Sequence, residues 1–431
     1  MSPRLSRITV LADSDTRWKW GAAVARQLAP EHVLDAVFLR SRTTPTERQL
    51  AEVGITPDSR RELTAAELVD DPQVADADLL VLAVTGGAVL ALIHSLGRAW
   101  EDRAHRPVVV SGYVGVVYEK LVDGLLTRAG TDVVLANSRY DTGRFRTAFA
   151  GVGVDPDSVV ECALPFLDGT PYAPSADRPF TLTFAVQPSV PKGRAARTHL
   201  LERAAAHARR HPEREVLIKL RSLPGEQTTH TEADPYQHLV EELAEPAPAN
   251  LRLVYGHMGE ILDRTDLLVT VSSTAALESM HRGIPTAILT DLGVREAHGN
   301  HYFVESGCLA SWDDLDAGSL PRVRPEWAAA QGIGVADPYA GARARIAGLR
   351  SAGSLPVLRP YYTPQRAGLY LEGLLRRHGL GLDGRPLPET PVADGGVRTV
   401  IRRAAGRGAK TLYGVGRKRV APALRKWGAV G

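Results

Sequence analysis

The chain has 431 residues, enough for two or three domains, and its 44% hydrophobic and 23% charged content excludes a disordered or fibrous protein. Two cysteines, Cys162 and Cys308, are too few for a disulfide framework or a cysteine metal cluster, which favours a reduced, cytoplasmic compartment. The net charge of +3 is unevenly distributed, because residues 397–431 hold ten Lys or Arg and no Asp or Glu. We expect no signal peptide and no transmembrane helix, since no apolar run approaches about 18 residues.

Predicted strands and helices alternate over residues 1–163. Apolar runs predict strands at 7–12, 33–39, 79–84, 107–110, 132–136 and 159–163. Helices are predicted at 18–28, 88–100, 117–128 and 139–150, and the polar stretch 41–61 is predicted to be a loop with a short helix. Such alternation is typical of a doubly wound parallel sheet. The polar or glycine-rich strand ends should then meet at its carboxyl edge, where these folds bind ligands.

Residues 164–179 hold four prolines and predict an interdomain linker. The alternation then restarts, with strands at 180–186, 215–220, 251–254, 267–271 and 286–289 and helices at 194–210, 236–243, 258–264 and 275–282. Residues 320–344 lack a clear pattern, whereas 363–379 has the capping Thr, first-turn Pro and final Gly of a helix. We therefore predict an α/β protein with an N-terminal domain at 1–163, a linker at 164–179, a second domain at 180–380 and a basic tail at 381–431.

The strongest ligand signal is a polar triplet between a strand and a helix. Ser272, Ser273 and Thr274 directly follow the apolar strand at 267–271. In a parallel sheet this junction presents free backbone N–H groups, which bind phosphate together with hydroxyl side chains. Glu278, four residues after Thr274, shares the helix face and suits a ribose diol. The alternative is that Ser272 or Ser273 only caps the helix.

The segment TVSSTAALESMHRGIPTAIL resembles the donor-binding segment of GT-B glycosyltransferases, and its Ser-Ser/Thr form is similar to that of bacterial capsule and polysialic-acid transferases. The resemblance is firm over 251–289, weaker over 180–220 and only architectural over 1–163. It implies a GT-B fold, in which two Rossmann-like domains face a cleft. It also implies a glycosyltransferase that moves a sugar from a nucleotide-sugar to a cell-envelope or polysaccharide acceptor, either a glycan or lipid-linked, without metal or cofactor. Those families carry a His-Pro motif where this chain has Lys219–Leu223, a departure that argues against CMP-sialic acid as the donor.

Basic residues complete the predicted donor site. Lys219 and Arg221 leave the strand at 215–220 at the expected cleft edge, and Lys192 and Arg194 flank a glycine after the first strand of the second half. Fixed positive charges there would stabilise a leaving phosphate. A solvated surface position is the alternative for each of them.

Proton transfer during glycosyl transfer needs a base and sometimes an acid. His257 is the candidate leaving-group acid and His230 a weaker one, although a loop histidine is more often structural. Asp13 and Asp15 follow the first strand and are the candidate bases, because two neighbouring carboxylates raise the pKa of one of them. The alternative is that Asp13 or Asp15 caps the helix at 18–28.

The basic residues 397–427 are interspersed with apolar and aromatic ones, which suits an anionic membrane surface. A solvated, disordered tail is an equal alternative, and nucleic acid ranks behind both. The expected location is the cytoplasm, with the tail offering attachment to the inner face of the membrane.

Two other functions stay open. A GT-B-fold nucleotide-sugar epimerase would carry a Gly-Gly turn where this chain has Ser272–Thr274. The second is a non-catalytic nucleotide- or phosphate-binding protein at the membrane surface. No metal site is predicted, and the acidic run 313–316 is predicted to begin a helix, whose N-terminus favours acids.

Overall fold

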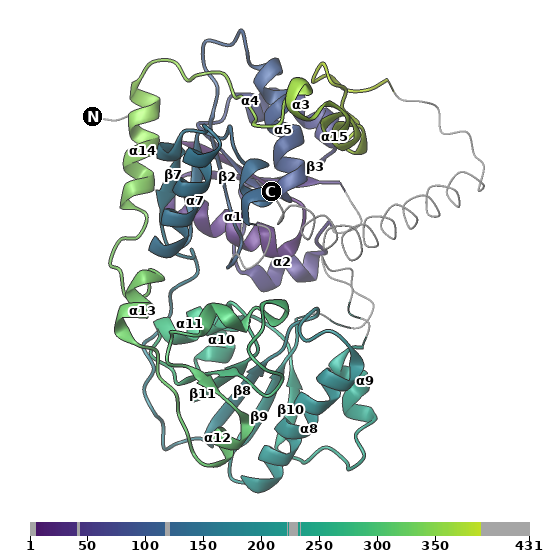
Figure 1. Ribbon diagram of the computed structural model, residues 1–431, viewed down its shortest axis with the longest axis vertical. Helices are drawn as coiled ribbons and strands as arrows, with labels where there is room; N and C mark the ends of the chain where they lie inside the picture. Colours follow the sequence, from purple (N-terminus) through teal and green to yellow (C-terminus); the bar gives the residue numbers. More distant parts are fainter. Residues whose placement is uncertain are drawn as a thin grey trace, which may run out of the picture. The chain divides into compact units, whose positions relative to one another are not determined.

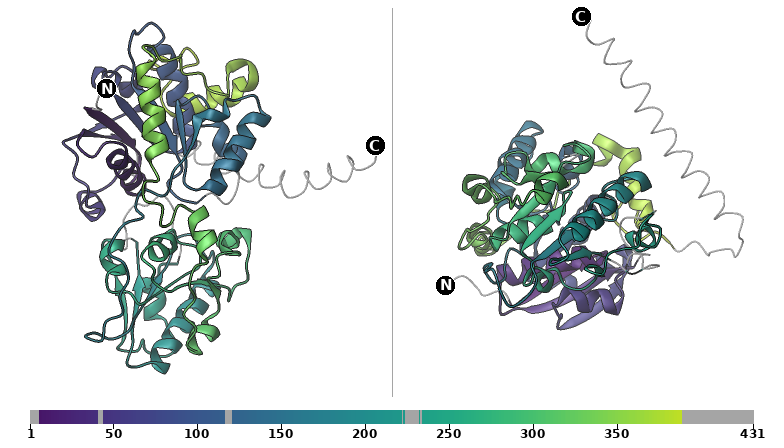
Figure 2. Two further views of the ribbon diagram at one scale, coloured as in Figure 1. Left: turned by 90° about the vertical axis from the view of Figure 1, so that its left-hand side faces the viewer. Right: turned by 90° about the horizontal axis from the view of Figure 1, so that it is seen from below.

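The computed structural model describes residues 6–40, 44–116, 121–221 and 234–388, together with residues 223 and 232. All of them except Pro388 belong to one compact unit that ends at Leu387 and contains two parallel β-sheets with helices packed on them (Figures 1 and 2). No helix in this part of the chain is long and apolar enough to cross a membrane. The segment 397–427 lies outside the described residues, so its role stays a prediction.

The first sheet has seven parallel strands in the order β3-β2-β1-β4-β5-β6-β7. Its strands are β1 (Arg7–Ala12), β2 (Val33–Leu39), β3 (Ser59–Leu63), β4 (Leu79–Ala83), β5 (Val108–Gly112), β6 (Val133–Ala136) and β7 (Val159–Glu161). The helices between them are α1 (Asp15–Leu28), α2 (Glu47–Val53), α3 (Ala65–Val69), α4 (Pro72–Ala75), α5 (Gly86–Ala99), α6 (Leu121–Leu126) and α7 (Arg139–Gly151). The strand order reverses between β1 and β4, and doubly wound sheets bind ligands beside the carboxyl ends of such strands.

Strand β3 corrects the prediction of a loop over 41–61. Its sequence, Ser-Arg-Arg-Glu-Leu, has no apolar run, and its residues alternate between half-buried and exposed. The strand pairs only with β2, at the edge of the sheet. Backbone hydrogen bonds rather than apolar burial hold such a strand, and charged side chains are typical of sheet edges. The short helix predicted in the same stretch is confirmed as α2.

The second sheet has six parallel strands in the order β10-β9-β8-β11-β12-β13. Its strands are β8 (Thr181–Ala185), β9 (Glu215–Lys219), β10 (Leu251–Val254), β11 (Leu267–Thr270), β12 (Thr286–Leu289) and β13 (Leu309–Ala310). Its helices are α8 (Arg194–Arg210), α9 (Tyr236–Glu241), α10 (Met258–Leu262), α11 (Ala275–His281) and α12 (Trp312–Asp316). The acidic run at 313–316 begins α12 as predicted, because Ser311 and Asp314 form a capping box.

The last helices return to the first sheet. Residues 320–344, unassigned from the sequence, contain α13 (Pro325–Ala330) and the start of α14 (Ala340–Ser351), which packs on β5, β6 and β7 (Figure 1). The predicted helix at 363–379 is α15 (Pro364–Arg377), which packs on α5. The predicted second domain at 180–380 includes both helices; a late helix that crosses back to the first domain is common in GT-B enzymes, and for the helix at 363–379 the sequence left that possibility open.

Arg282 fixes the linker to the second half of the protein. Its side chain is 6% exposed, and Nε donates to the carbonyl oxygen of Asp168 at 3.1 Å. Nη1 donates to Gly259 O at 3.1 Å and pairs with Asp263 at 2.6 Å. Gly169, at φ +101°, lies against the guanidinium group, and a Cβ there would clash with it. One buried side chain therefore holds the linker, α10 and the end of α11 together.

We expect Arg282→Met to destabilise the fold by about 2 kcal/mol, because it leaves buried carbonyl groups without a donor. The free energy of unfolding from urea titration measures the loss. Arg264→Met is the matched control, since Arg264 is exposed. An equal effect of the two substitutions would contradict the anchoring role of Arg282.

Candidate functional site

Eight of the ten site residues predicted from the sequence line one cavity of about 370 Å³. Its walls come from the segments that follow β1, β5, β8, β9, β10 and β11 at the carboxyl ends of these strands, together with α2 and Phe166. The eight residues are Asp15, Lys219, Arg221, His257, Ser272, Ser273, Thr274 and Glu278. The other two, Asp13 and Lys192, are not among the lining residues.

The three hydroxyl residues of the turn have different roles. Ser272 is 2% exposed, and its Oγ donates to His298 O at 2.6 Å, so this side chain builds the turn itself. Ser273 Oγ accepts from the backbone N–H of Ala275 at 3.3 Å, a local capping contact. Thr274 is the N-cap residue of α11 but makes no side-chain capping bond. Ser273 and Thr274 are half-buried and remain the hydroxyls best placed for a ligand, while α11, with seven residues, contributes only a short helix dipole.

Lys219 and Arg221 bring positive charge to the same cavity. Lys219 is 7% exposed, and its Nζ donates to Leu220 O at 2.6 Å. Burial lowers the pKa of Lys219 to about 8; the carboxylate of Glu52 opposes this shift and the ammonium group of Lys19 supports it. Arg221 Nη2 donates to Asp15 Oδ1 at 3.0 Å. An anionic ligand would relieve the mutual repulsion of these cations.

Asp13 and Asp15 point to different partners. Asp13 pairs with Arg17 at 2.7 Å and accepts from the backbone N–H of Thr85 at 3.1 Å, at the start of α5. Asp15 instead faces Arg221 across the cavity. The alternative in which one of them caps the first helix is wrong, because Ser14 is the N-cap residue of α1 and accepts no side-chain capping bond.

Lys19 is a lining residue that the sequence analysis missed. Its Nζ lies 3.7 Å from Glu278 Oε2 and 4.6 Å from the centre of the Phe166 ring. Burial raises the pKa of Glu278, and the charge of Lys19 counteracts the rise. The available signal was spacing, since Lys19 follows Asp15 by four residues and so shares its helix face. Gln187, which accepts from the backbone N–H of Ser272 at 3.1 Å, gave no signal in the sequence.

The structure places His257 and Lys192 differently, and only His257 lies at the cavity. His257 lines the cavity, and burial lowers its pKa, with the charge of Lys19 acting in the same direction. The neutral ring is a weaker proton donor than imidazolium, so the acid role needs a ligand that raises this pKa. Lys192 is exposed, and its neighbour Arg194 pairs with Asp234 at 3.9 Å. His230 lies outside the described residues.

Comparison with known protein families decides the family. Residues 8–349 match the family model described as "Putative glycosyltransferase (DUF6716)". The chain belongs to this family. No curated protein sequence matches it.

Solved structures show the fold of this DUF6716 member. The "putative UDP-N-acetylglucosamine 2-epimerase" of Listeria monocytogenes aligns with a TM-score of 0.50 at 11% identity, over 80% of this chain and 94% of that one. The S. aureus MnaA–UDP complex aligns with a TM-score of 0.50 at 13% identity, over 79% and 95%. The spinosyn rhamnosyltransferase SpnG aligns with a TM-score of 0.38 at 15% identity, over 81% and 98%. The predicted GT-B fold with two Rossmann-like domains is confirmed, and the narrower likeness to capsule and polysialic-acid transferases stays a prediction.

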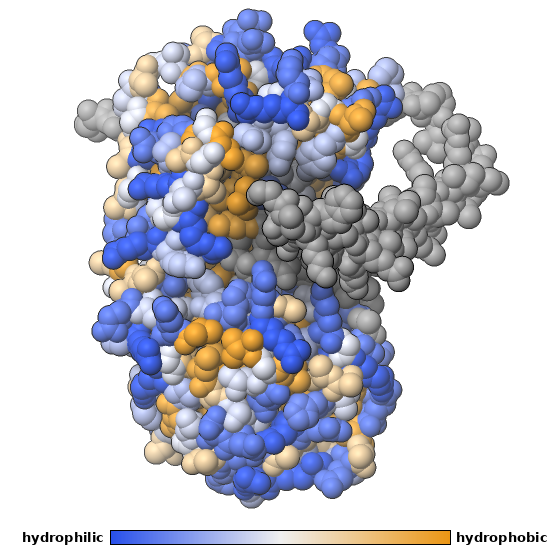
Figure 3. Space-filling view, viewed as in Figure 1, coloured by the Kyte–Doolittle hydropathy of each residue, from blue (hydrophilic) through white to orange (hydrophobic). Residues whose placement is uncertain are grey.

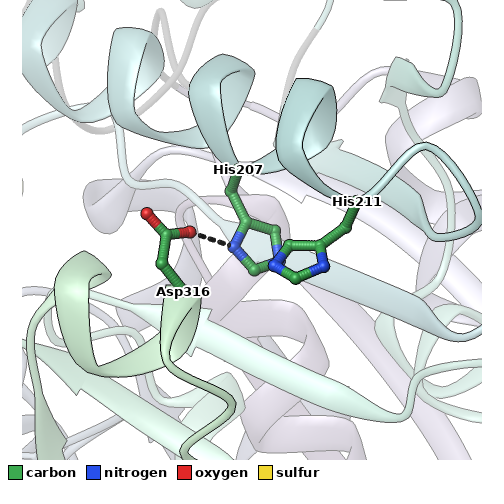
Figure 4. A group of neighbouring side chains, drawn as sticks. All are labelled: His207, His211 and Asp316. Carbon is green, nitrogen blue, oxygen red and sulfur yellow. Dashed lines mark hydrogen bonds and ion pairs between the residues drawn. The ribbon is translucent and has the colours of Figure 1, made fainter.

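One group in the described part of the DUF6716 chain has metal-ligand chemistry: His207, His211 and Asp316, whose ligand atoms lie within 4.8 Å of one another (Figure 4). His207 Nδ1 contacts Asp316 at 2.6 Å. Three arginines contact two of the three residues, because Arg203 and Arg210 lie 3.5 and 3.4 Å from Asp316 and Arg214 lies 3.4 Å from His207 Nε2. Their charge disfavours a further cation, so the group is better explained as an ion-pair network.

Burial lowers the pKa of His207, which is fully buried. The unfolded chain then binds the proton more readily, so this histidine contributes stability above about pH 6.5 that is lost as the pH falls. We expect the melting temperature to drop between about pH 7 and pH 5, and to drop less in His207→Asn. Differential scanning fluorimetry measures both profiles, and parallel curves would contradict the assignment.

Proposed function

We propose that this protein transfers a sugar from a nucleotide-sugar donor to a cell-envelope or polysaccharide acceptor, without a metal ion. One observation carries the proposal: Ser273, Thr274, Lys219, Arg221 and Glu278, predicted separately from the sequence, line one cavity. Hydroxyls, fixed cations and a carboxylate are the groups that a phosphorylated nucleoside requires. Membership of the glycosyltransferase family supports the reaction class.

In this proposal the donor phosphates lie against Ser273 and Thr274, between Lys219 and Arg221. Negative charge grows on the leaving phosphate as the glycosidic bond breaks, so fixed cations stabilise the transition state more than the bound donor. Glu278 accepts hydrogen bonds from the ribose hydroxyls. Lys19, held between Glu278 and Phe166, adds a third positive charge from the first half of the protein.

Asp15 is the base that the geometry favours over Asp13. Asp15 lines the cavity and forms an ion pair with Arg221. Asp13 instead pairs with Arg17 and accepts a hydrogen bond from the backbone N–H of Thr85. A donor phosphate that takes the place of Asp15 on Arg221 would release this carboxylate. The carboxylate would then accept the proton of the acceptor hydroxyl as that oxygen attacks the sugar.

Nucleotide-sugar epimerisation is the second candidate. It is favoured by the carboxylates of Asp15, Glu52 and Glu278 and the ring of His257 around one cavity, a set suited to moving protons at a bound sugar. The two reactions differ in whether an acceptor is needed. Incubation with UDP-N-acetylglucosamine alone, followed by NMR, separates them, because only an epimerase forms the epimeric sugar, whereas a transferase without an acceptor can at most hydrolyse the donor.

A thermal-shift panel of CMP, CDP, UDP, GDP and dTDP, free and as sugars, tests the donor site. A ligand that binds only the folded protein raises its melting temperature. We expect one nucleotide to stabilise the wild type and to stabilise Ser273→Ala less. If no nucleotide shifts either protein, the proposed donor site is wrong, and a binding protein for another ligand takes its place.

The proposed acceptor lies in the cell envelope. The basic, partly apolar sequence of residues 397–427 supports a position of the enzyme at the membrane. For this basic segment we propose contact with the inner, anionic face of the membrane.

A further inference from the structure

The outer face of α15 differs from an ordinary helix surface. Leu371, Leu374 and Leu375 are buried and pack toward α5. On the opposite side Leu369 is 89% exposed, more than any other large apolar side chain among the described residues, and Tyr370 is 49% exposed. Figure 3 shows apolar surface where Figure 1 draws this helix, at the upper right. A single exposed leucine is common in soluble proteins, so the meaning depends on its neighbours.

Tyr370 follows Leu369 in α15, and its ring is the last of a row of three tyrosine rings, of which Tyr361 and Tyr362 are half-buried. The ring centres of Tyr361 and Tyr362 are 5.3 Å apart, and those of Tyr362 and Tyr370 are 5.4 Å apart. Arg366 lies over the Tyr361 ring at 4.7 Å. We call the surface made by these side chains and the last turn of the helix the α15 face; it comprises Tyr361, Tyr362, Arg366, Leu369, Tyr370, Arg376 and Arg377.

The α15 face is positively charged. Arg366, Arg376 and Arg377 are exposed, and the acid of this helix, Glu372, pairs with Arg376 at 2.8 Å. A neighbouring groove of about 550 Å³ is lined by Arg345 and Arg359 as well as Arg366. The acids that line the groove are Asp132, which Arg106 holds at 2.7 Å, and Asp155, the N-cap residue of a short helix. The carboxylate of Asp123, on α6, also acts on Tyr362 of this face. The surface therefore combines tyrosines, one projecting leucine, and the guanidinium groups of Arg366 and Arg377, which have no ion-pair partner among the described residues.

We propose that the α15 face lies flat on an anionic lipid bilayer. Tyrosine rings partition to the level of the lipid headgroups, a projecting leucine enters the acyl boundary, and arginines bind lipid phosphates. Each basic residue near such a surface adds about 1 kcal/mol of attraction. The α15 face thus gives the compact unit that ends at Leu387 its own membrane contact, separate from the one proposed for residues 397–427.

The positive charge of the α15 face favours an anionic bilayer over two other possible partners, the C-terminal segment and a second copy of the chain. The segment that follows Leu387 in sequence has the same sign of charge as the face, because residues 388–431 hold ten Lys or Arg and only two acids, Glu389 and Asp394. A second copy of the chain would place the arginines of one face against those of the other, since two-fold contacts use the same surface on both copies. An anionic surface complements both the α15 face and the basic sequence beyond it.

The test is co-sedimentation of the full-length protein with vesicles of phosphatidylcholine alone or mixed with phosphatidylglycerol. We expect binding to the mixed vesicles only, and about ten-fold weaker binding for Leu369→Ser combined with Tyr370→Ser. Val304→Ser combined with Leu320→Ser is the matched control, because these side chains are 53% and 45% exposed elsewhere. Unchanged melting temperatures show that the variants fold.

Three results would overturn the proposal: no binding by the wild type, equal binding to both kinds of vesicle, or undiminished binding by the α15 variant. The last would assign the membrane contact to residues 389–431. Because the substituted side chains lie outside the donor cavity, the nucleotide thermal shift of every variant is expected to equal that of the wild type. A failure here is therefore distinct from a failure of the proposed function.

Discussion

Replacing Lys219 by methionine is expected to weaken nucleotide binding about 30-fold, which corresponds to about 2 kcal/mol, a typical value for a hydrogen bond to a charged group. The ammonium group is buried at the end of β9 and has one hydrogen bond, to Leu220 O. A bound phosphate would be its second partner. Methionine retains most of the volume of the lysine, so the fold should persist while the charge is lost. Isothermal titration calorimetry with the nucleotide found in the thermal-shift panel measures the difference.

The pH dependence of binding identifies Lys219 as the titrating group. Burial lowers its pKa to about 8, so the free protein loses this charge at mildly alkaline pH. The protonated form binds the anion, and affinity is therefore full below that pKa and declines as the pH rises above it. Lys219→Arg should bind with an affinity that hardly changes between about pH 7 and pH 9, because arginine stays protonated. If the wild type and Lys219→Arg show the same profile, Lys219 does not contact the phosphate.

The fold was largely predictable because buried parallel strands carry apolar runs. The bounds of β10 and β12 were predicted to the residue, and the GT-B plan followed from two series of alternating strands and helices. Strand β3 was missed because an edge strand needs no apolar run. The return of α15 to the first sheet was left open, and that of α14 was not considered, because an amphipathic pattern shows that a helix has a partner, not which partner it has.

The donor side of the candidate site was predictable to a similar degree. Ser273, Thr274 and Glu278 lie at a strand–helix junction, and the carboxyl edge of a parallel sheet brings such junctions together. What the sequence could not show is pairing across the cavity. The contacts of Asp15 with Arg221 and of Lys19 with Glu278 join residues more than two hundred positions apart in the chain, and no local pattern records them. The sequence also could not predict the different environments of Asp13 and Asp15, since both residues follow β1 within three positions.

Asp15→Asn is expected to separate catalysis from binding. Removal of a general base lowers turnover by about 10²- to 10⁴-fold, and asparagine cannot take the acceptor proton. Nucleotide binding should not weaken and should even tighten, because Asp15 competes with phosphate for Arg221 in the free protein. The measurements are the rate of sugar transfer to an identified acceptor and the nucleotide affinity of the same variant.

Asp13→Asn is the matched control for that experiment. Asp13 does not line the cavity, and it binds Arg17 and the backbone N–H of Thr85. Its loss should therefore lower the melting temperature and leave most of the turnover. Opposite results, with turnover lost in Asp13→Asn and kept in Asp15→Asn, would assign the base to Asp13 and show that the loop after β1 rearranges when the donor binds. If both variants keep full turnover, neither carboxylate is the base. The choice of Asp15 over Asp13 as the base rests on the Asp15–Arg221 ion pair. A donor phosphate that binds Arg221 would free Asp15, so donor binding would itself activate the acceptor hydroxyl.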